Sequence, residues 1–207
     1  MTSVINASTT TGISLSSDTT GNLAIQTSGT TVATAANGAL TVNSYSAGAS
    51  LITSGTAQNT TSGTSITFIG IPSWVKRITV MFQQVSTNGS SVVLVQVGSG
   101  SPQTSGYLGA GVSAGGTNVV VGANYTTGFG LGGNNSASVF ISGSVVLTQI
   151  YTNVWNCSYS LARSDAGYSA TGGGSTGAMS GALDRVRITT VNGTDTFSAG
   201  AINILYE

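Results

Sequence analysis

The chain has 207 residues, of which only 10 are charged, five of each sign, so the formal net charge is zero. Histidine is absent, cysteine occurs once, and Gly numbers 30. Without histidine there is no Ser–His–Asp or Cys–His catalysis, and one cysteine is too little for a zinc site or an intrachain disulfide. Five cations form no basic patch for nucleic acid. We therefore expect a protein that is not an enzyme and that uses no cofactor or metal.

The hydropathy of the chain favours a folded protein over a disordered one. Hydrophobic residues make up 40% of the chain and the mean hydropathy is +0.28, whereas disordered chains combine low hydrophobicity with high net charge. No apolar stretch reaches the roughly 18–20 residues that span a bilayer. The start, Met1-Thr2-Ser3, lacks the basic residues and apolar run of a signal peptide. We expect a soluble protein that does not insert into membranes.

The first 50 residues predict a short β-meander. Between positions 11 and 44, short runs alternate apolar with polar residues, as at Leu23 and Ile25, and turn residues such as Asn37-Gly38 separate the runs. Each run offers two apolar side chains on one face, so the meander buries little and needs a partner surface. We predict an anchor and oligomerisation segment over residues 1–50, followed by a linker over 51–64 that is poor in large side chains.

Residues 65–207 predict a larger β domain. Apolar and polar residues alternate over 78–82, 155–161 and 202–206, and Thr, whose branched Cβ favours strands, is abundant. Eight to ten such strands favour an antiparallel β-sandwich that resembles a jelly roll. The all-β fold thus joins a meander to a sandwich. The longest predicted loops are Gly-rich and cover residues 98–118, 122–137 and 164–182.

Two glycine motifs of enzymes occur, and we interpret both as chance matches. Gly111–Gly115 fits G-x-S-x-G, which needs a histidine and a following helix. Gly172–Gly177 fits G-x-G-x-x-G, which needs a strand-to-helix turn; we predict a flexible loop instead. Cys157 is predicted to be a small buried apolar residue. A calcium site that combines Asp165 or Asp195 with loop carbonyls stays open.

Two groups of residues are candidates for contacts with other molecules. Tyr107, Tyr125 and Phe129 fall in the predicted Gly-rich loops, where their rings would either stack on sugars or a partner, or pack within the loops. Arg185 and Arg187 share one face of a predicted strand. They would either form ion pairs between subunits, contact an acidic glycan, or lie on a solvated strand face.

Two stretches of the domain, 71–82 and 187–207, resemble a C-terminal module of tailed-bacteriophage virion proteins, which include head fibres, capsid decoration proteins and tail fibres. The segment 12–44, with Asp18-Thr19-Thr20-Gly21-Asn22-Leu23, resembles N-terminal segments of such proteins. The resemblance implies a homotrimer that the N-terminal segment anchors to the virion and whose C-terminal domain projects. It brings no catalytic residues with it.

The leading hypothesis is therefore a non-enzymatic viral structural protein on the surface of a bacteriophage particle. It would be a trimeric capsid decoration (cement) protein or head fibre that binds other virion proteins, such as the major capsid or tail proteins. The head is favoured over the tail because 207 residues leave little length for a tail-fibre shaft. The alternative is a short tail-fibre or receptor-binding protein that recognises host surface glycans. A glycan-degrading spike is disfavoured by the few carboxylates.

Overall fold

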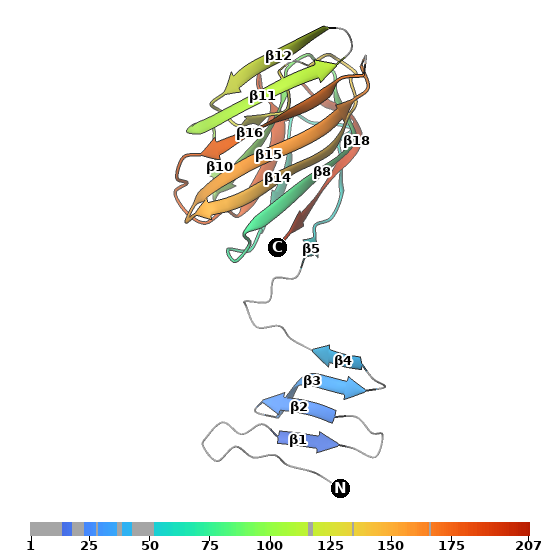
Figure 1. Cartoon of the computed structure of the whole chain (residues 1–207), viewed down its shortest axis with the longest axis vertical. Helices are drawn as coiled ribbons and strands as arrows, with labels where there is room; N and C mark the ends of the chain where they lie inside the picture. The colour runs from blue at the N-terminus through green and yellow to red at the C-terminus, as the bar shows by residue number, and fades with distance from the viewer. Residues whose placement is uncertain are drawn as a thin grey trace. The chain divides into compact units, whose positions relative to one another are not determined.

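The protein folds as two compact β units, Met1–Ser50 and Leu51–Glu207 (Figure 1). The described residues contain strands and turns only, which confirms the all-β prediction, and they include no helix that could cross a membrane. The computed structural model describes residues 14–17, 23–27, 29–36, 39–42, 52–115, 118–133, 135–165 and 167–207.

The first unit is an antiparallel meander of four neighbouring strands, as the alternation predicts. Its third and fourth strands pair in register from Ala36↔Ala39 to Ala33↔Val42. The predicted turn residues Asn37 and Gly38 lie outside the described residues. The strands are β1 (Ser14–Ser17), β2 (Leu23–Thr27), β3 (Thr30–Ala36) and β4 (Ala39–Val42).

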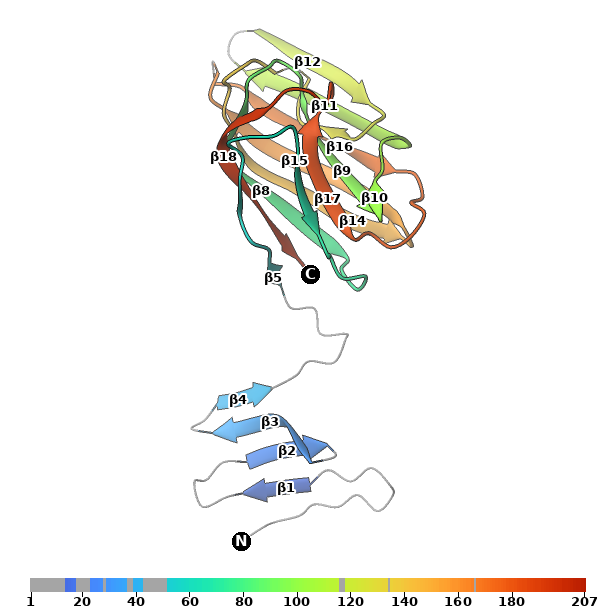
Figure 2. The same cartoon turned by 180° about the vertical axis from the view of Figure 1, so that it is seen from behind.

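The second unit is a sandwich of two antiparallel sheets, which Figures 1 and 2 show from opposite sides. The nine-stranded large sheet has the order β12-β11-β16-β15-β14-β8-β18-β5, and β6 also pairs with β18. The five-stranded small sheet has the order β10-β9-β17-β7, and β13 also pairs with β9. Jelly-roll connectivity stays a prediction.

The bounds of these strands follow from the backbone pairing. In the large sheet they are β5 (Thr53–Ser54), β6 (Gln58–Asn59), β8 (Arg77–Thr87), β11 (Tyr107–Gly115), β12 (Asn118–Tyr125), β14 (Ile141–Tyr151), β15 (Val154–Arg163), β16 (Ser169–Thr176) and β18 (Phe197–Tyr206). In the small sheet they are β7 (Ile66–Ile69), β9 (Val93–Ser99), β10 (Ser101–Pro102), β13 (Phe129–Gly130) and β17 (Arg185–Thr190).

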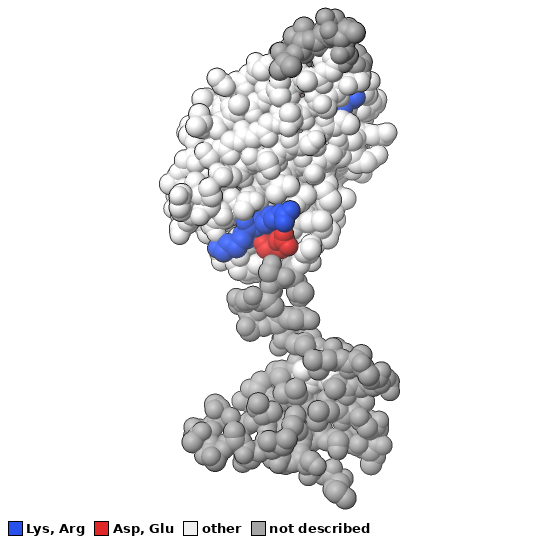
Figure 3. Space-filling model, in the orientation of Figure 1, with Lys and Arg blue, Asp and Glu red and all other residues white. Residues whose placement is uncertain are grey.

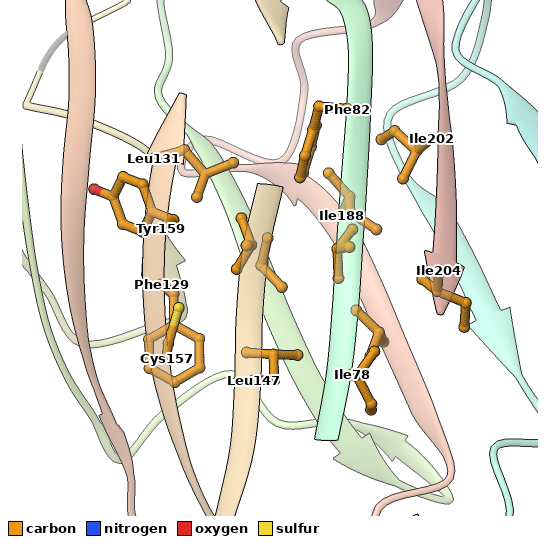
Figure 4. Packing of buried hydrophobic residues seen from close by; sticks show 14 of the residues in the cluster. Ile78, Phe82, Phe129, Leu131, Leu147, Cys157, Tyr159, Ile188, Ile202 and Ile204 are labelled. Atoms are coloured by element: carbon orange, nitrogen blue, oxygen red, sulfur yellow. The ribbon is translucent and has the colours of Figure 1, made fainter. Parts of the chain in front are cut away.

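The core lies between the two sheets and is filled by every second residue of the long strands (Figure 4). Ile78 on β8, Leu147 on β14 and Ile204 on β18 belong to it from the large sheet, and Val186 and Ile188 on β17 from the small one. Each of these side chains is buried, and full burial of such a side chain contributes about 1.5–3 kcal/mol. The domain therefore carries its own core.

The structure differs from the predicted linker over 51–64. The Gly55 N–H donates to the Ile204 carbonyl at 2.8 Å, and the Thr60 N–H donates to the Gly200 carbonyl at 2.9 Å. These bonds and the short strands β5 and β6 occupy the edge of β18, whose backbone groups would otherwise lack partners in the sheet. Residues 52–64 are therefore an edge of the sandwich.

The structure also corrects the three predicted Gly-rich loops, because they contain the strands β11, β12 and β16. β11 and β16 pair in register from Tyr107↔Thr176 to Ala114↔Ser169. The run Gly172–Gly174, predicted to be a flexible loop, lies within β16, and β16 has neighbours on both sides. The hydrogen bonds between strands come from the backbone and need no apolar side chains. A glycine-rich segment can therefore be a central strand where the side chain of a neighbouring residue fills the space that a Cβ atom would occupy.

Candidate interaction surface

The outward face of the large sheet is broad and nearly free of charge. Figure 3 shows it as one continuous uncharged area with the charged residues at its margins. Arg77 and Glu207 form an ion pair at one such margin, with 3.2 Å between Nη1 and Oε1. The strand register aligns residues across six strands in two outward rows: Val112, Thr171, Ser160, Ser144, Met81 and Asn203, and Ala110, Gly173, Ser158, Val146, Thr79 and Leu205.

Small side chains give this face its shape and its chemistry. A shallow hollow of about 610 Å³ lies over β11, β12 and β16 and is lined by small residues such as Ala110, Gly172 and Gly173. Hydroxyl groups, among them those of Ser158 and Ser160, offer hydrogen bonds without charge. Small side chains lose little rotamer entropy when a partner covers them, and contacts without charge are insensitive to salt. The face is therefore suited to close contact with another flat surface.

The structure buries the three aromatic residues that the sequence marks as possible glycan or partner contacts. Tyr107, Tyr125 and Phe129 are 4%, 8% and 1% exposed. The Tyr107 and Phe129 rings meet edge to face, with 5.0 Å between their centroids. The Tyr107 hydroxyl accepts a bond from the Val97 N–H at 3.0 Å, and burial raises the pKa of both tyrosines. The structure therefore contradicts a surface role for these rings and supports the packing alternative.

A fourth aromatic residue, Tyr159, completes this packing and was not predicted as a partner of the Gly-rich segments. Its hydroxyl donates to the Gly130 carbonyl at 2.7 Å and accepts from the Gly132 N–H at 2.9 Å. The Tyr125 hydroxyl donates to the Gly132 carbonyl at 2.6 Å. Figure 4 shows the Tyr159 ring beside Leu131 in the core. The two hydroxyl groups thus hold the segment that contains β13 in place.

Arg185 and Arg187 share the outward face of β17, as predicted, but they differ in their partners. Arg185 binds its neighbour Asp184 through two bonds, of which Nε to Oδ1 is 2.8 Å. The Asp184 carboxylate also accepts from the Gly100 N–H at 3.1 Å. These hydrogen bonds, first that of Arg185, lower the pKa of Asp184. Arg187 has no such carboxylate among the described residues.

The remaining titratable groups are engaged within the domain. Arg163 is buried and binds the Asp165 carboxylate through Nε at 2.9 Å and Nη2 at 2.7 Å. Asp195 accepts from the Ser91 N–H at 2.9 Å. Cys157 is buried, and burial raises the pKa of its thiol to about 12. Among the described residues, no three His, Cys, Asp or Glu side chains gather as a metal site.

Comparison of the chain with protein-family models, with curated proteins and with solved structures found no match. The resemblance to phage virion proteins therefore stays a prediction that rests on the residues quoted for it. The two-unit organisation, the uncharged face and the charged residues of β17 are the features from which a function can be argued.

Proposed function

We propose that this protein is a non-enzymatic structural protein of a bacteriophage virion, a capsid decoration or head-fibre protein that assembles as a homotrimer. The observation that carries the proposal is the division of the chain into a small four-stranded meander and a self-contained sandwich. In this proposal the meander is the anchor and the sandwich is the displayed domain.

The meander supports an anchoring role because it is too small to be stable by itself. Its strands have four to seven residues, and a single small sheet needs a hydrophobic face packed on something else. Association with further copies, or with another virion protein, would supply that burial. The sandwich has its own core and needs no such help.

The outward face of the large sheet supports a role on a particle surface. It presents hydroxyl groups and small apolar groups in place of charges. Because few of its groups titrate or are screened by salt, its contacts would persist as pH and ionic strength change. This neutral face would lie against a neighbouring subunit or against the capsid.

The test is to locate the protein on phage particles with an antibody raised against the sandwich. Labelled heads, together with a trimer in sedimentation of the purified full chain, are the expected result. Labelled tails would favour the alternative of a receptor-binding tail protein. In that alternative, the buried rings of Tyr107, Tyr125 and Phe129 could not contact a glycan. Tyr151, which is 72% exposed at the β14–β15 turn, could still stack on a sugar. Particles that carry no label would overturn the proposal.

A further inference from the structure

The few charges of the sandwich are matched almost completely within the chain. Three arginines form ion pairs, with Glu207, Asp165 and Asp184. Lys76 donates to the Gln149 side-chain oxygen at 2.6 Å. Among the described residues, Arg187 is the one cation that has neither an ion pair nor a hydrogen bond. Arg187 is therefore the candidate for a contact with a charged group outside the chain.

Arg187 lies in the middle of the small sheet, not at its margin. It is opposite Gln96 on β9 and Thr67 on β7 in the strand register. Its neighbours Val186 and Ile188 belong to the core, so alternation directs the Arg187 side chain to the outward face. The residue is half-buried, and its Nε is enclosed without an acceptor among the described residues. A positive charge here is partly desolvated and has no counter-charge.

Gln96, across from Arg187 on the same face, is also incompletely bonded. The residue is 3% exposed. Its amide nitrogen donates to the Thr127 carbonyl at 2.7 Å, whereas its enclosed Oε1 has no donor. A buried polar atom without a partner costs about 1–3 kcal/mol. The enclosed Oε1 of Gln96 and Nε of Arg187 are out of reach of a second molecule. Nη1 and Nη2 of Arg187 are not enclosed and have no partner among the described residues, so a second molecule can complete the bonding there.

We propose that Arg187 forms a binding point for the carboxylate of an Asp or Glu side chain on a neighbouring protein. The planar guanidinium fork matches the two oxygens of a carboxylate. Ile69, 71% exposed on β7, lies opposite Arg185 and diagonally across the same face from Arg187, where it adds an apolar contact. Arginine is enriched among the residues that carry most of the binding energy at protein interfaces.

Arg185 provides an internal control for this assignment. It is two residues away on the same strand and face, and opposite Ile69 in the register. Its guanidinium already binds the Asp184 carboxylate, so it has much less capacity for an external acid. If positive charge in general attracted the partner, substitution of Arg185 and of Arg187 would weaken binding equally. If only the arginine without an ion pair binds the partner, substitution of Arg187 alone would weaken binding.

The first test uses nuclear magnetic resonance of the full-length protein. The chain has four arginines, so its arginine Nε–H region holds four signals, which substitution of each residue assigns. The probe is sodium acetate, titrated against sodium chloride at equal ionic strength. The Arg187 signal should shift at least twice as far in acetate as in chloride, while the Arg185 signal responds alike to both. An Arg187 signal that does not distinguish the two salts would overturn the assignment.

The second test uses particles that lack the protein and measures binding of labelled full-length variants. R187Q should bind about 10-fold more weakly or worse, R187K should not restore binding because it cannot bond in bidentate fashion, and R185Q should stay within about twofold of the wild type. R187Q should unfold at no lower temperature than the wild type, since it removes an uncompensated charge. A lowered melting temperature would assign Arg187 a structural role instead.

The identity of the partner rests on the proposed function, and the two can fail separately. If the wild-type protein binds no particle, the virion assignment falls, and the acetate titration alone decides whether Arg187 binds carboxylates. If the wild type binds and R187Q binds equally well, the carboxylate point is overturned while the virion assignment stands.

Discussion

The interior of the sandwich is filled in two different ways. Around β8, β14, β17 and β18, branched aliphatic side chains alternate along the strands and interlock, as Val80, Val145 and Ile188 do. Around β11, β13 and β16, the strands carry glycine, and tyrosine rings from other elements fill the space. The first group of strands, here called the aliphatic half, relies on many similar side chains. The second group, the glycine half, relies on a few specific contacts.

Tyr159 shows how the glycine half works. A Cβ atom added at Gly111 or at Gly172 would overlap the Tyr159 hydroxyl, and one added at Gly130 would overlap the Tyr125 ring. Glycine weakens a strand by about 0.5–1 kcal/mol relative to alanine. Here that loss is offset because the ring hydroxyl can reach the backbone of the segment 130–132. A few positions therefore determine the packing of the whole half.

Substitution in the glycine half should have the largest effect. In Gly172→Val, the new side chain meets the Tyr159 hydroxyl and the Ala110 carbonyl, which belongs to the β11–β16 ladder and cannot move without breaking it. We expect a loss of about 4 kcal/mol in the free energy of unfolding, measured by urea denaturation. Thr171→Val, on the exposed face of the same strand, removes one hydroxyl that donates to the Tyr159 carbonyl at 3.1 Å and should cost no more than about 1 kcal/mol. Equal stability of the two variants would show that the glycine is not required.

A deletion in the aliphatic half should cost somewhat less, because neighbouring side chains can relax into the gap. Leu147 is fully buried at the centre of that half. Leu147→Ala should lower the free energy of unfolding by about 3 kcal/mol. Val146→Ala on the outward face should lower it by less than about 1 kcal/mol, and the pair would be compared by thermal and urea unfolding. A larger loss at Val146 would mean that the outward face is covered in the native assembly.

The same contrast explains what the sequence could predict. Alternation of large apolar with polar residues identifies the aliphatic strands, the all-β class and the meander. It gives no indication at β11, which reads Gly-Ala-Gly-Val-Ser over 109–113, because its packing partner Tyr159 lies on another strand. Strands of two residues, such as β5 and β6, leave no periodicity at all, so the segment 51–64 was predicted to be a linker.

The charged residues show the same limit for the candidate site. Sequence alternation correctly placed Arg185 and Arg187 on one face of a strand. It could not tell them apart. Alternation does not show that Asp184, which precedes the strand, turns its carboxylate onto Arg185, and the surroundings of Arg187 come from the distant strands β7 and β9. The aromatic residues Tyr107, Tyr125 and Phe129 were predicted in loops, and pairing between distant strands decided that they are buried.

Removal of one hydroxyl group tests the specific bonds of the glycine half with only a small change of volume. Tyr159→Phe leaves the Gly130 carbonyl and the Gly132 N–H without their partner. We expect a loss of about 2 kcal/mol in the free energy of unfolding. Tyr151→Phe, at an exposed position, should change it by less than about 0.5 kcal/mol. Equal, small effects would mean that shape alone holds the segment 130–132.

The response of stability to pH is smallest near neutral pH and differs between the two ends of the pH scale. The chain has no histidine, so no side chain with an ordinary pKa titrates between about pH 6 and 8, and the free energy of unfolding should be level there. Above that range, the Cys157 thiol of the unfolded chain ionises with a pKa of about 8.5, whereas burial raises the pKa of this thiol to about 12 in the folded protein. Stability should therefore decline as pH rises between these values, and less steeply in Cys157→Ser.

On the acid side, the decline should depend on the Arg163–Asp165 pair. The hydrogen bonds from Arg163 lower the pKa of Asp165, so the stabilisation is fully present above the unfolded value of about 3.9 and is lost as pH falls through the lower folded pKa. Asp165→Asn should lower the free energy of unfolding by about 1–2 kcal/mol at pH 7, because Arg163 is buried while Asp165 is partly exposed. The difference between variant and wild type should shrink toward zero below about pH 3. A difference that stays constant down to the acid transition would mean that the ion pair contributes through packing and not through charge.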